Sequence, residues 1–163
     1  MSMILCLKET PDAKIEELLR DPDSIETFVD EAEDSGYFEL DKAWHGIHFL
    51  LTNSDWQGEK PLCYLLYGGK PIGDIDVGYG PANAITSKQV AEFDAALETI
   101  DESEFRSRFN PKLMMTSEIY PTIWDRPIEE DDTLGYLCEY FRNLKDYVKT
   151  AKQANHGMII WMC

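Results

Sequence analysis

One stretch constrains the fold of this chain more than any other: residues 40–52, LDKAWHGIHFLLT. Leu40, Trp44, Ile47 and Leu51 follow one another at spacings of four, three and four, so on a helix they share one face. The small and apolar residues beside them widen that face and leave little polar surface. We therefore predict a helix over this stretch, buried on most sides, with Asp41 as its N-cap.

Two short apolar runs lie near the two ends of the sequence, MILCL at Met3–Leu7 and MIIWM at Met158–Met162. Runs of this kind are typical of strands that are covered on both faces. We predict that the two strands pair in one small sheet. Most of the chain between them has helical periodicity, with the longest helix over Asp132–Asn155. The sequence thus predicts a single α+β domain over residues 1–163, predominantly helical.

Several local patterns mark where helices begin. Thr86 and Gln89 have the spacing of a capping box, in which each side chain bonds the backbone N–H of the other. The pairs Asp21-Pro22 and Asn110-Pro111 fit an N-cap followed by proline at the first helical position. Asp101 is predicted to cap a further helix that runs through to residue 109.

The region from residue 53 to residue 83 is the least regular part of the sequence. Five of the ten glycines fall within residues 68–80, a density that indicates turns and loops. We predict a short buried helix over Pro61–Tyr67 and a brief strand over Asn83–Ile85. Further along, the prolines of EIYPTIWDRP (residues 118–127) indicate an extended stretch.

The charge of the chain is strongly negative: 31 acidic residues against 15 Lys and Arg give a net charge of −16. Nucleic acids and anionic membranes need Lys or Arg partners, so we expect neither as a partner. Two interpretations of the charge stay open. It can simply keep the protein soluble, or it can attract a basic protein partner by complementary charge.

The four cysteines are widely spaced and form no C-x-x-C motif. Cys6, Cys63 and Cys138 lie in apolar runs, where a free cysteine behaves as a small hydrophobic residue. We predict reduced core thiols, as in a cytoplasmic protein. The first apolar run stops at Lys8 and is too short for a signal peptide, and nothing later is long enough for a membrane span.

Motifs for cofactors are missing. His45 and His48 are three residues apart, whereas a helical zinc site uses H-E-x-x-H with a spacing of four and a Glu. A metal site needs at least three ligands, so we predict no metal and no other cofactor. Gly78-Tyr79-Gly80 lacks the rest of a phosphate-binding loop. A catalytic role of His48 as general base, oriented by Asp41 or Glu118, stays open.

Tyrosines form a second stripe along the longest predicted helix, at Tyr136, Tyr140 and Tyr147. Aromatic residues beside an apolar face are more often the edge of the core than an interface. Tyrosine is nonetheless enriched at interfaces, so a homodimer stays possible.

Several motifs together resemble the YfbM-like family, a bacterial group known only as a domain of unknown function. They are DKAWHGIH…LLT, GGKPIG, GYGPANAIT, EIYPTIWD and the long helix that leads into MIIWM, and they cover nearly the whole chain. Asn53 stands where the family pattern has Gly, and His45 has no counterpart in it. The resemblance implies a single α+β domain and brings no activity, cofactor or substrate.

Two functions are compatible with these observations. The first is a non-catalytic binding module with an acidic surface, for example an immunity-type inhibitor of a basic partner. The alternative is a small-molecule-binding protein or hydrolase, with a pocket where the Trp44 helix, the glycine-rich loop and EIYPTIWD meet. We favour the interpretation of Trp44 and Trp124 as plain core residues over this pocket. Its predicted lining residues are Asp41, Trp44, His48, Tyr79, Glu118, Tyr120 and Trp124.

Overall fold

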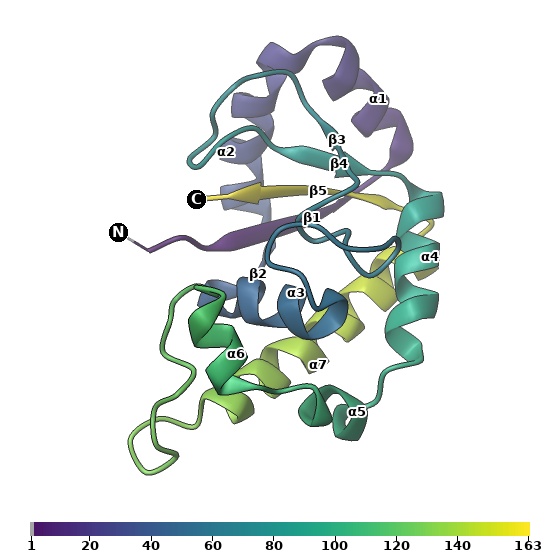
Figure 1. Ribbon diagram of the computed structural model, residues 1–163. Helices are drawn as coiled ribbons and strands as arrows, with labels where there is room; N and C mark the ends of the chain where they lie inside the picture. Colours follow the sequence, from purple (N-terminus) through teal and green to yellow (C-terminus); the bar gives the residue numbers. More distant parts are fainter. Residues whose placement is uncertain (1) are drawn as a thin grey trace.

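The computed structural model describes residues 2–163, which are built around a five-stranded antiparallel sheet (Figure 1). The strand order is β2-β1-β5-β4-β3. Strands from the two ends of the sequence therefore lie side by side in the middle of the sheet. The strands are β1 (Leu5–Thr10), β2 (Phe38–Glu39), β3 (Lys70–Pro71), β4 (Asn83–Ile85) and β5 (Gly157–Met162).

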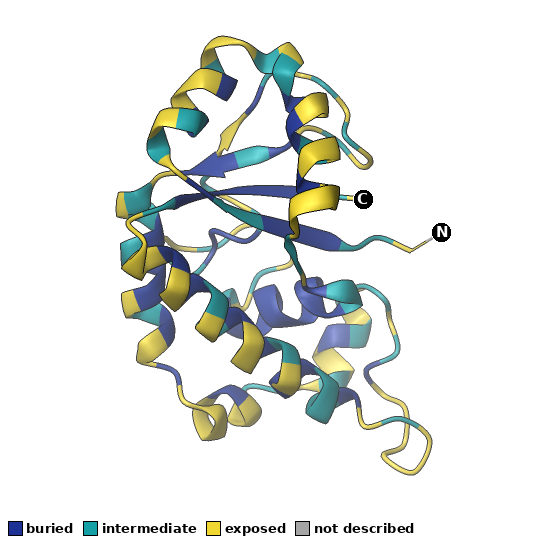
Figure 2. Cartoon of the chain, turned by 180° about the vertical axis from the view of Figure 1, so that it is seen from behind, coloured by how far each residue is buried: buried dark blue, intermediate teal, exposed yellow. Residues whose placement is uncertain are grey.

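Helices cover both faces of the sheet. One face carries α1 (Asp12–Arg20) and α2 (Ile25–Ser35), joined by the 3-10 turn η1 (Pro22–Ser24), and α2 crosses in front of the strands in Figure 2. The other helices belong to the opposite face. They are α3 (Trp44–Thr52) after the 3-10 turn η2 (Asp41–Ala43), α4 (Ser87–Glu98), α5 (Glu102–Ser107), α6 (Pro111–Thr116) and α7 (Thr133–Gln153).

This arrangement confirms the predicted α+β fold. The predicted pairing of the two end strands is also confirmed, because β1 and β5 pair along their whole length. Alternate side chains enter two cores: Leu5, Leu7 and Ile160 join the larger core with α3, α4 and α7, whereas Cys6 and Trp161 join the smaller core under α1 and α2. In residues 2–163, no helix is both long enough and apolar enough to cross a membrane.

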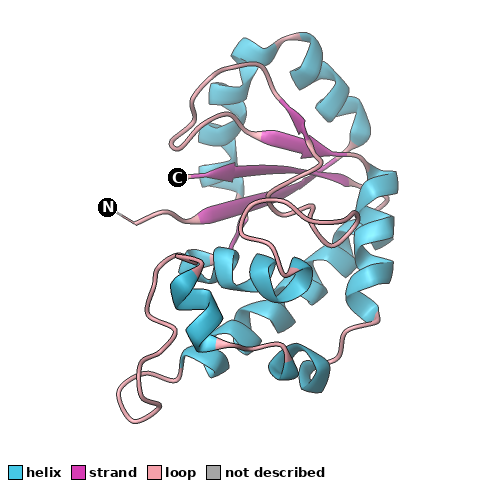
Figure 3. Cartoon of the chain, in the orientation of Figure 1, coloured by secondary structure: helices cyan, strands magenta, loops and turns pink. Residues whose placement is uncertain are grey.

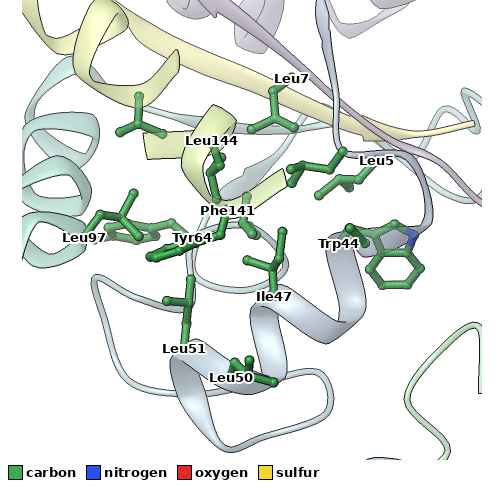
Figure 4. Close-up of a cluster of buried hydrophobic side chains, with 14 of the residues drawn as sticks. Leu5, Leu7, Trp44, Ile47, Leu50, Leu51, Tyr64, Leu97, Phe141 and Leu144 are labelled. Carbon is green, nitrogen blue, oxygen red and sulfur yellow. The ribbon is translucent and has the colours of Figure 1, made fainter. Parts of the chain in front are cut away.

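The predicted burial of the Trp44 helix is confirmed. Trp44, Ile47 and Leu51 are buried, and so is every other residue of α3 before Thr52. Figure 4 shows Ile47 pointing from α3 towards Phe141 of α7. Since α3 has protein on nearly all sides, it forms the middle of the larger core, and the segments around it are placed by contact with it.

Most of the predicted caps are present. Thr86 accepts a hydrogen bond from Gln89 N–H at 3.2 Å, and Gln89 Oε1 accepts one from Thr86 N–H at 2.8 Å. The side chains of Asp101 and Asn110 cap α5 and α6, although α5 ends at Ser107 rather than at residue 109. β4 lies where the predicted strand was placed.

Two predicted caps are wrong. Asp41 does not cap the buried helix, because it adopts a left-handed backbone (φ +46°) and its carboxylate bonds the Tyr136 hydroxyl instead. The helix therefore begins later, at Trp44, after the turn η2. Asp21 makes no side-chain cap, and Pro22 starts a 3-10 turn.

Three predicted segments have different structures. Residues 61–67 form consecutive turns rather than a helix, with Cys63 N–H bonding Glu59 O but Tyr64 N–H bonding Pro61 O. Residues 118–127 are also turns rather than extended chain, held by bonds such as Thr122 N–H to the residue 119 carbonyl. The first strand begins at Leu5 and continues through polar residues to 10, because the backbone pairs with β5 regardless of side-chain polarity.

Candidate functional site

A cleft of about 570 Å³ lies on the α3 side of the sheet, between residues 60–69 and the strands β4 and β5. Figure 3 shows the loop that carries residues 60–69 as a pink segment between α3 and the strands. The volume of the cleft is within the usual range for small-molecule sites. The lining residues are Leu5, Lys60, Tyr64–Gly69, Pro71, Tyr79, Pro81, Asn83 and Ile160–Met162.

The first wall of the cleft is held firmly by the end of α3. Asn53 ends that helix in the left-handed conformation (φ +55°), which asparagine tolerates well. Thr52 Oγ1 then accepts a hydrogen bond from Ser54 N–H at 3.1 Å and turns the chain. Further on, Cys63 is fully buried, and its carbonyl accepts a bond from Tyr67 N–H at 2.8 Å. The wall is thus a packed segment rather than a free loop.

Three tyrosines give the cleft its aromatic character. Tyr64 is buried, with its ring edge-on to Phe93 at 6.2 Å between centroids and its hydroxyl 3.5 Å from Glu92. Tyr67 and Tyr79 are instead 47% and 41% exposed. Exposed aromatic side chains that line one cleft are typical of a ligand-binding or partner-binding surface.

The second wall is a tight turn that presents Tyr79. One carboxylate oxygen of Asp76 accepts hydrogen bonds from Gly78 N–H at 2.8 Å and Gly80 N–H at 2.9 Å, and these bonds lower the pKa of Asp76. Tyr79 N–H donates to Met162 O at 3.1 Å. Gly78 has φ +148°, and a Cβ there would come 2.5 Å from Met162 O, so only glycine fits this close approach.

The charge of the lining is opposite to that of the whole chain. Lys60 is the one charged residue among the lining residues, and none of them is an acid, although the sequence has 31. Asn83 adds an amide that can both donate and accept hydrogen bonds. The cleft therefore combines apolar and aromatic walls with a single cation.

The two histidines of α3 are buried and neutral. His45 Nδ1 accepts from Tyr120 N–H at 2.9 Å, which leaves Nε2–H to donate to Asp55 O at 2.9 Å. Neither nitrogen of His48 has a partner with hydrogen-bond geometry in the described residues, although the Gln57 backbone lies close by. Burial lowers the pKa of His48 to about 4 and also lowers that of His45. No group of three potential metal ligands occurs within residues 2–163.

Trp44 belongs to an aromatic cluster that joins four segments. Its ring stacks on His45 at 4.8 Å and on Tyr120 at 5.6 Å between centroids, and Trp56 packs on His45 at 4.7 Å. Trp44 Nε1–H donates to Met3 O at 3.0 Å, and Met3 N–H donates to the Tyr120 hydroxyl at 3.1 Å. The polar groups of Trp44, Met3 and Tyr120 thus bond within the cluster, which holds the segments around the start of α3 together.

The other predicted site residues lie elsewhere. Asp41 bonds the Tyr136 hydroxyl at 2.7 Å. Glu118 is exposed in a turn with φ +53°. Trp124 is buried against Gly46 of α3 and lines a separate groove of about 770 Å³ beside α6 and the start of α7.

The structure thus divides the seven predicted residues among different surroundings. It brings Trp44 and Tyr120 together in the aromatic cluster, and of the seven only Tyr79 lines the cleft. The sequence analysis missed Lys60, which directly precedes the segment predicted as a helix, and Tyr67, which is the last residue of that segment. The glycines that follow Tyr67 were the signal that this segment turns back on the strands.

Comparisons with other proteins identify the family but no activity. Residues 1–161 match the family described as "Domain of unknown function (DUF1877)". The chain belongs to this family. A crystal structure of YfbM from Escherichia coli, a protein of unknown function, superposes with a TM-score of 0.75 at 22% identity and covers 100% of both chains. At this identity the likeness shows that this DUF1877 member shares the YfbM fold. No curated protein matches the chain.

Proposed function

We propose that this DUF1877 protein is a non-catalytic binding protein whose cleft takes a small anionic ligand with a flat apolar body. The observation that carries the proposal is the lining of the cleft. It has exposed tyrosine rings and one lysine but no carboxylate, in a chain whose net charge is −16. Apolar walls with few polar groups are what a small-molecule site needs.

The lining argues against catalysis in the cleft. It contains no His, Cys, Ser, Thr, Asp or Glu, so it lacks the common Ser–His and Cys–His pairs of nucleophile and base. The buried histidines do not add a base to the cleft. Both nitrogens of His45 hydrogen-bond backbone groups, and His48 has no exposed surface. Binding without reaction is therefore the function that this geometry supports best.

The preference for an anion follows from where the charges lie. The field of the acidic chain repels anions from most of its surface. Lys60 is exposed and provides a local cation in the lining of the cleft, where no other lining residue is a carboxylate. A carboxylate, sulfonate or phosphate group on the ligand would form a charge-assisted hydrogen bond there. The flat body would lie against Tyr67 and Tyr79.

Two fluorescent dyes test the proposal: anilinonaphthalene sulfonate and its uncharged analogue phenylnaphthylamine. We expect both to bind the apolar walls and Lys60→Met to weaken the sulfonate roughly tenfold while leaving the uncharged dye unchanged. Tyr79→Ala should weaken both dyes. Lys152→Met, an exposed lysine in the last turn of α7, is the matched control and should change neither. Equal effects of Lys60→Met and Lys152→Met would contradict the proposal.

A second candidate function rests on the position of the acidic residues. Residues 12–36 contain ten acidic and two basic residues, so this segment has a net charge of −8, half of that of the chain. It forms the α1–α2 layer on one side of the sheet (Figure 2). Glu26, Asp30 and Asp76 surround one shallow depression there. Such a surface would steer a basic protein partner by complementary charge.

The partner test compares two neutralised variants of equal charge. The pair Glu26→Gln/Asp30→Asn changes the acidic layer, whereas Glu139→Gln/Asp146→Asn changes exposed acids of α7. If the layer binds a basic protein, the wild type and the α7 variant should capture that protein at low salt, and the variant of the acidic layer should not. Raised salt should abolish capture by the wild type as well. Equal capture by both variants would exclude a specific role of this layer.

Two further expectations stay predictions. A homodimer through the α7 tyrosines would have to use rings that already bond within the chain. Tyr136 bonds Asp41 and Tyr147 bonds the β1 backbone, although all three rings are partly exposed. A cytoplasmic location likewise stays a prediction from the cysteine usage.

A further inference from the structure

Two of the four cysteines lie in direct contact. Cys6 of β1 and Cys163, just beyond β5, place their sulfur atoms 3.1 Å apart, although all four cysteines are free. Cys63 and Cys138 are buried in other elements, the wall of the cleft and α7. The contact joins residues that are 157 positions apart in the sequence. The predicted burial of Cys6, Cys63 and Cys138 is confirmed.

The backbone around the two sulfur atoms is fixed by the sheet. Ile4 N–H donates to Cys163 O at 2.8 Å, and Cys163 N–H donates to Ile4 O at 2.9 Å. Cys6 pairs with Trp161 in the ladder between β1 and β5. The sulfur atoms thus meet diagonally across two paired strands, on the side of the sheet under α2. A disulfide needs them only about 1 Å closer.

We propose that Cys6 and Cys163 are a thiol–disulfide exchange site, which forms an intramolecular disulfide when the protein meets a low-molecular-weight disulfide. The proposal is independent of the ligand of the cleft. The disulfide would join β1 covalently to the residue that follows β5, and a thiol would reduce this bond again.

The exchange proceeds in two balanced steps. The thiolate of Cys163 attacks one sulfur of the small disulfide RSSR, which gives Cys163–S–SR and releases RS⁻. Cys6 then attacks Cys163 Sγ, which breaks the S–SR bond, and the second leaving group departs with the proton of Cys6 as RSH. The two cysteines are oxidised by two electrons together, and RSSR is reduced to two thiols.

The environments of the two thiols set this order. Cys163 is exposed and can meet RSSR in solution, whereas Cys6 has no exposed surface. Burial, together with the contact to Cys163, raises the pKa of the Cys6 thiol well above its ordinary value. A buried protonated thiol is a poor first nucleophile, so Cys6 acts second, where its closeness to Cys163 replaces diffusion.

Oxidised glutathione, followed by mass spectrometry and thiol counting in denaturant, tests the proposal on the full chain. We expect the number of titratable thiols to fall from four to two and the mass to fall by about 2 Da, for two hydrogens. Peptide mapping should join Cys6 to Cys163, and dithiothreitol should restore all four thiols. A stable glutathione adduct on wild-type Cys163, or no reaction, would overturn the proposal.

Single substitutions separate the two roles. Cys6→Ser should keep the glutathione adduct on Cys163, because no second thiol displaces it, and Cys163→Ser should not react. Cys63→Ser and Cys138→Ser are the controls and should form the internal disulfide as the wild type does. Internal disulfide formation that requires Cys63 or Cys138 would also overturn the assignment.

Discussion

The hydroxyl of Tyr136 donates a hydrogen bond to Asp41 Oδ2 at 2.7 Å and accepts one from Lys42 N–H at 3.1 Å. Asp41 has φ +46°, a left-handed conformation that is uncommon outside glycine, although Asn and Asp adopt it more often than most residues. One tyrosine of α7 therefore holds the turn η2 that leads into the buried helix α3. Burial and the neighbouring Asp41 carboxylate raise the pKa of Tyr136 far above its ordinary value, so its hydroxyl stays a donor.

Tyr136→Phe is expected to destabilise the protein by about 1–3 kcal/mol, because it removes both hydrogen bonds and leaves polar groups partly buried. Urea unfolding followed by circular dichroism measures the change. Asp41→Asn is the matched variant, since asparagine keeps an acceptor and tolerates the left-handed backbone. It should cost less than Tyr136→Phe. A larger loss in Asp41→Asn would show that the charge of Asp41, rather than the hydroxyl network, stabilises the turn.

Stability should fall in mild acid because of His48. Its pKa is about 4 in the folded protein and near 6.5 when unfolded, so the unfolded state binds a proton first as the pH drops. The stabilisation from neutral His48 is fully present above about pH 6.5 and is lost as the pH falls towards 4, by up to about 3 kcal/mol. His45 adds to this in the same direction. Urea midpoints across this range measure the effect.

His48→Leu should flatten that pH dependence, because leucine has no proton to bind. A proton titration of the wild type by NMR gives an independent check, in which the His48 ring stays neutral through about pH 5. An ordinary titration of His48 near pH 6.5, or a leucine variant with the pH dependence of the wild type, would refute the prediction.

Gly46 marks the closest approach between α3 and its neighbours. A Cβ at this position would lie 2.8 Å from the side chain of Leu137 and 3.0 Å from the ring of Trp124. Gly46→Ala is therefore expected to destabilise the protein by about 1–3 kcal/mol through overpacking. In the double variant with Leu137→Ala, the loss of stability should be smaller than the sum of the two single losses, since Leu137→Ala removes the nearest clash. Additive losses in the double variant would contradict this account.

Asp76 should control the order of the turn that presents Tyr79. Asp76→Ala removes the acceptor of two backbone N–H groups, so the amides of Gly78 and Gly80 should exchange with solvent faster. Hydrogen exchange followed by NMR measures this, with the amides of α7 as the internal reference. Asp76→Asn keeps one acceptor oxygen and should have a smaller effect. Unchanged exchange in the alanine variant would mean that the backbone bonds of Val77 and Tyr79 fix the turn without Asp76.

Local patterns predicted the helices well because their causes lie within a few residues. The capping box of Thr86 and Gln89 and the buried face of Trp44 need only helical spacing to be recognised. The cap assigned to Asp41 failed because a distant tyrosine competes for the same carboxylate. The two-residue strands β2 and β3 were missed because so short a strand has no periodicity of its own.

The cleft could not be predicted, because its walls come from segments that are far apart in the sequence. Tyr79 was predicted for a different pocket, beside Trp44 and Glu118, and in the cleft its neighbours Lys60 and Tyr67 meet it only through the fold. His48 has the residue type of a catalytic base, yet no spacing rule shows that both its nitrogens are enclosed. Residue type suggests chemistry, and tertiary contacts decide which side chains can perform it.

The pairing of β1 with β5 has a consequence for how this chain is made. As the nascent chain leaves the ribosome, β2 can pair with β1 early, but the longer pairing of β1 forms only after Gly157–Met162 has been made. Until then one edge of β1 lacks its partner strand. Such distant pairings slow folding and prolong exposure of apolar strands, so the newly made chain should depend on chaperones until β5 has been synthesised.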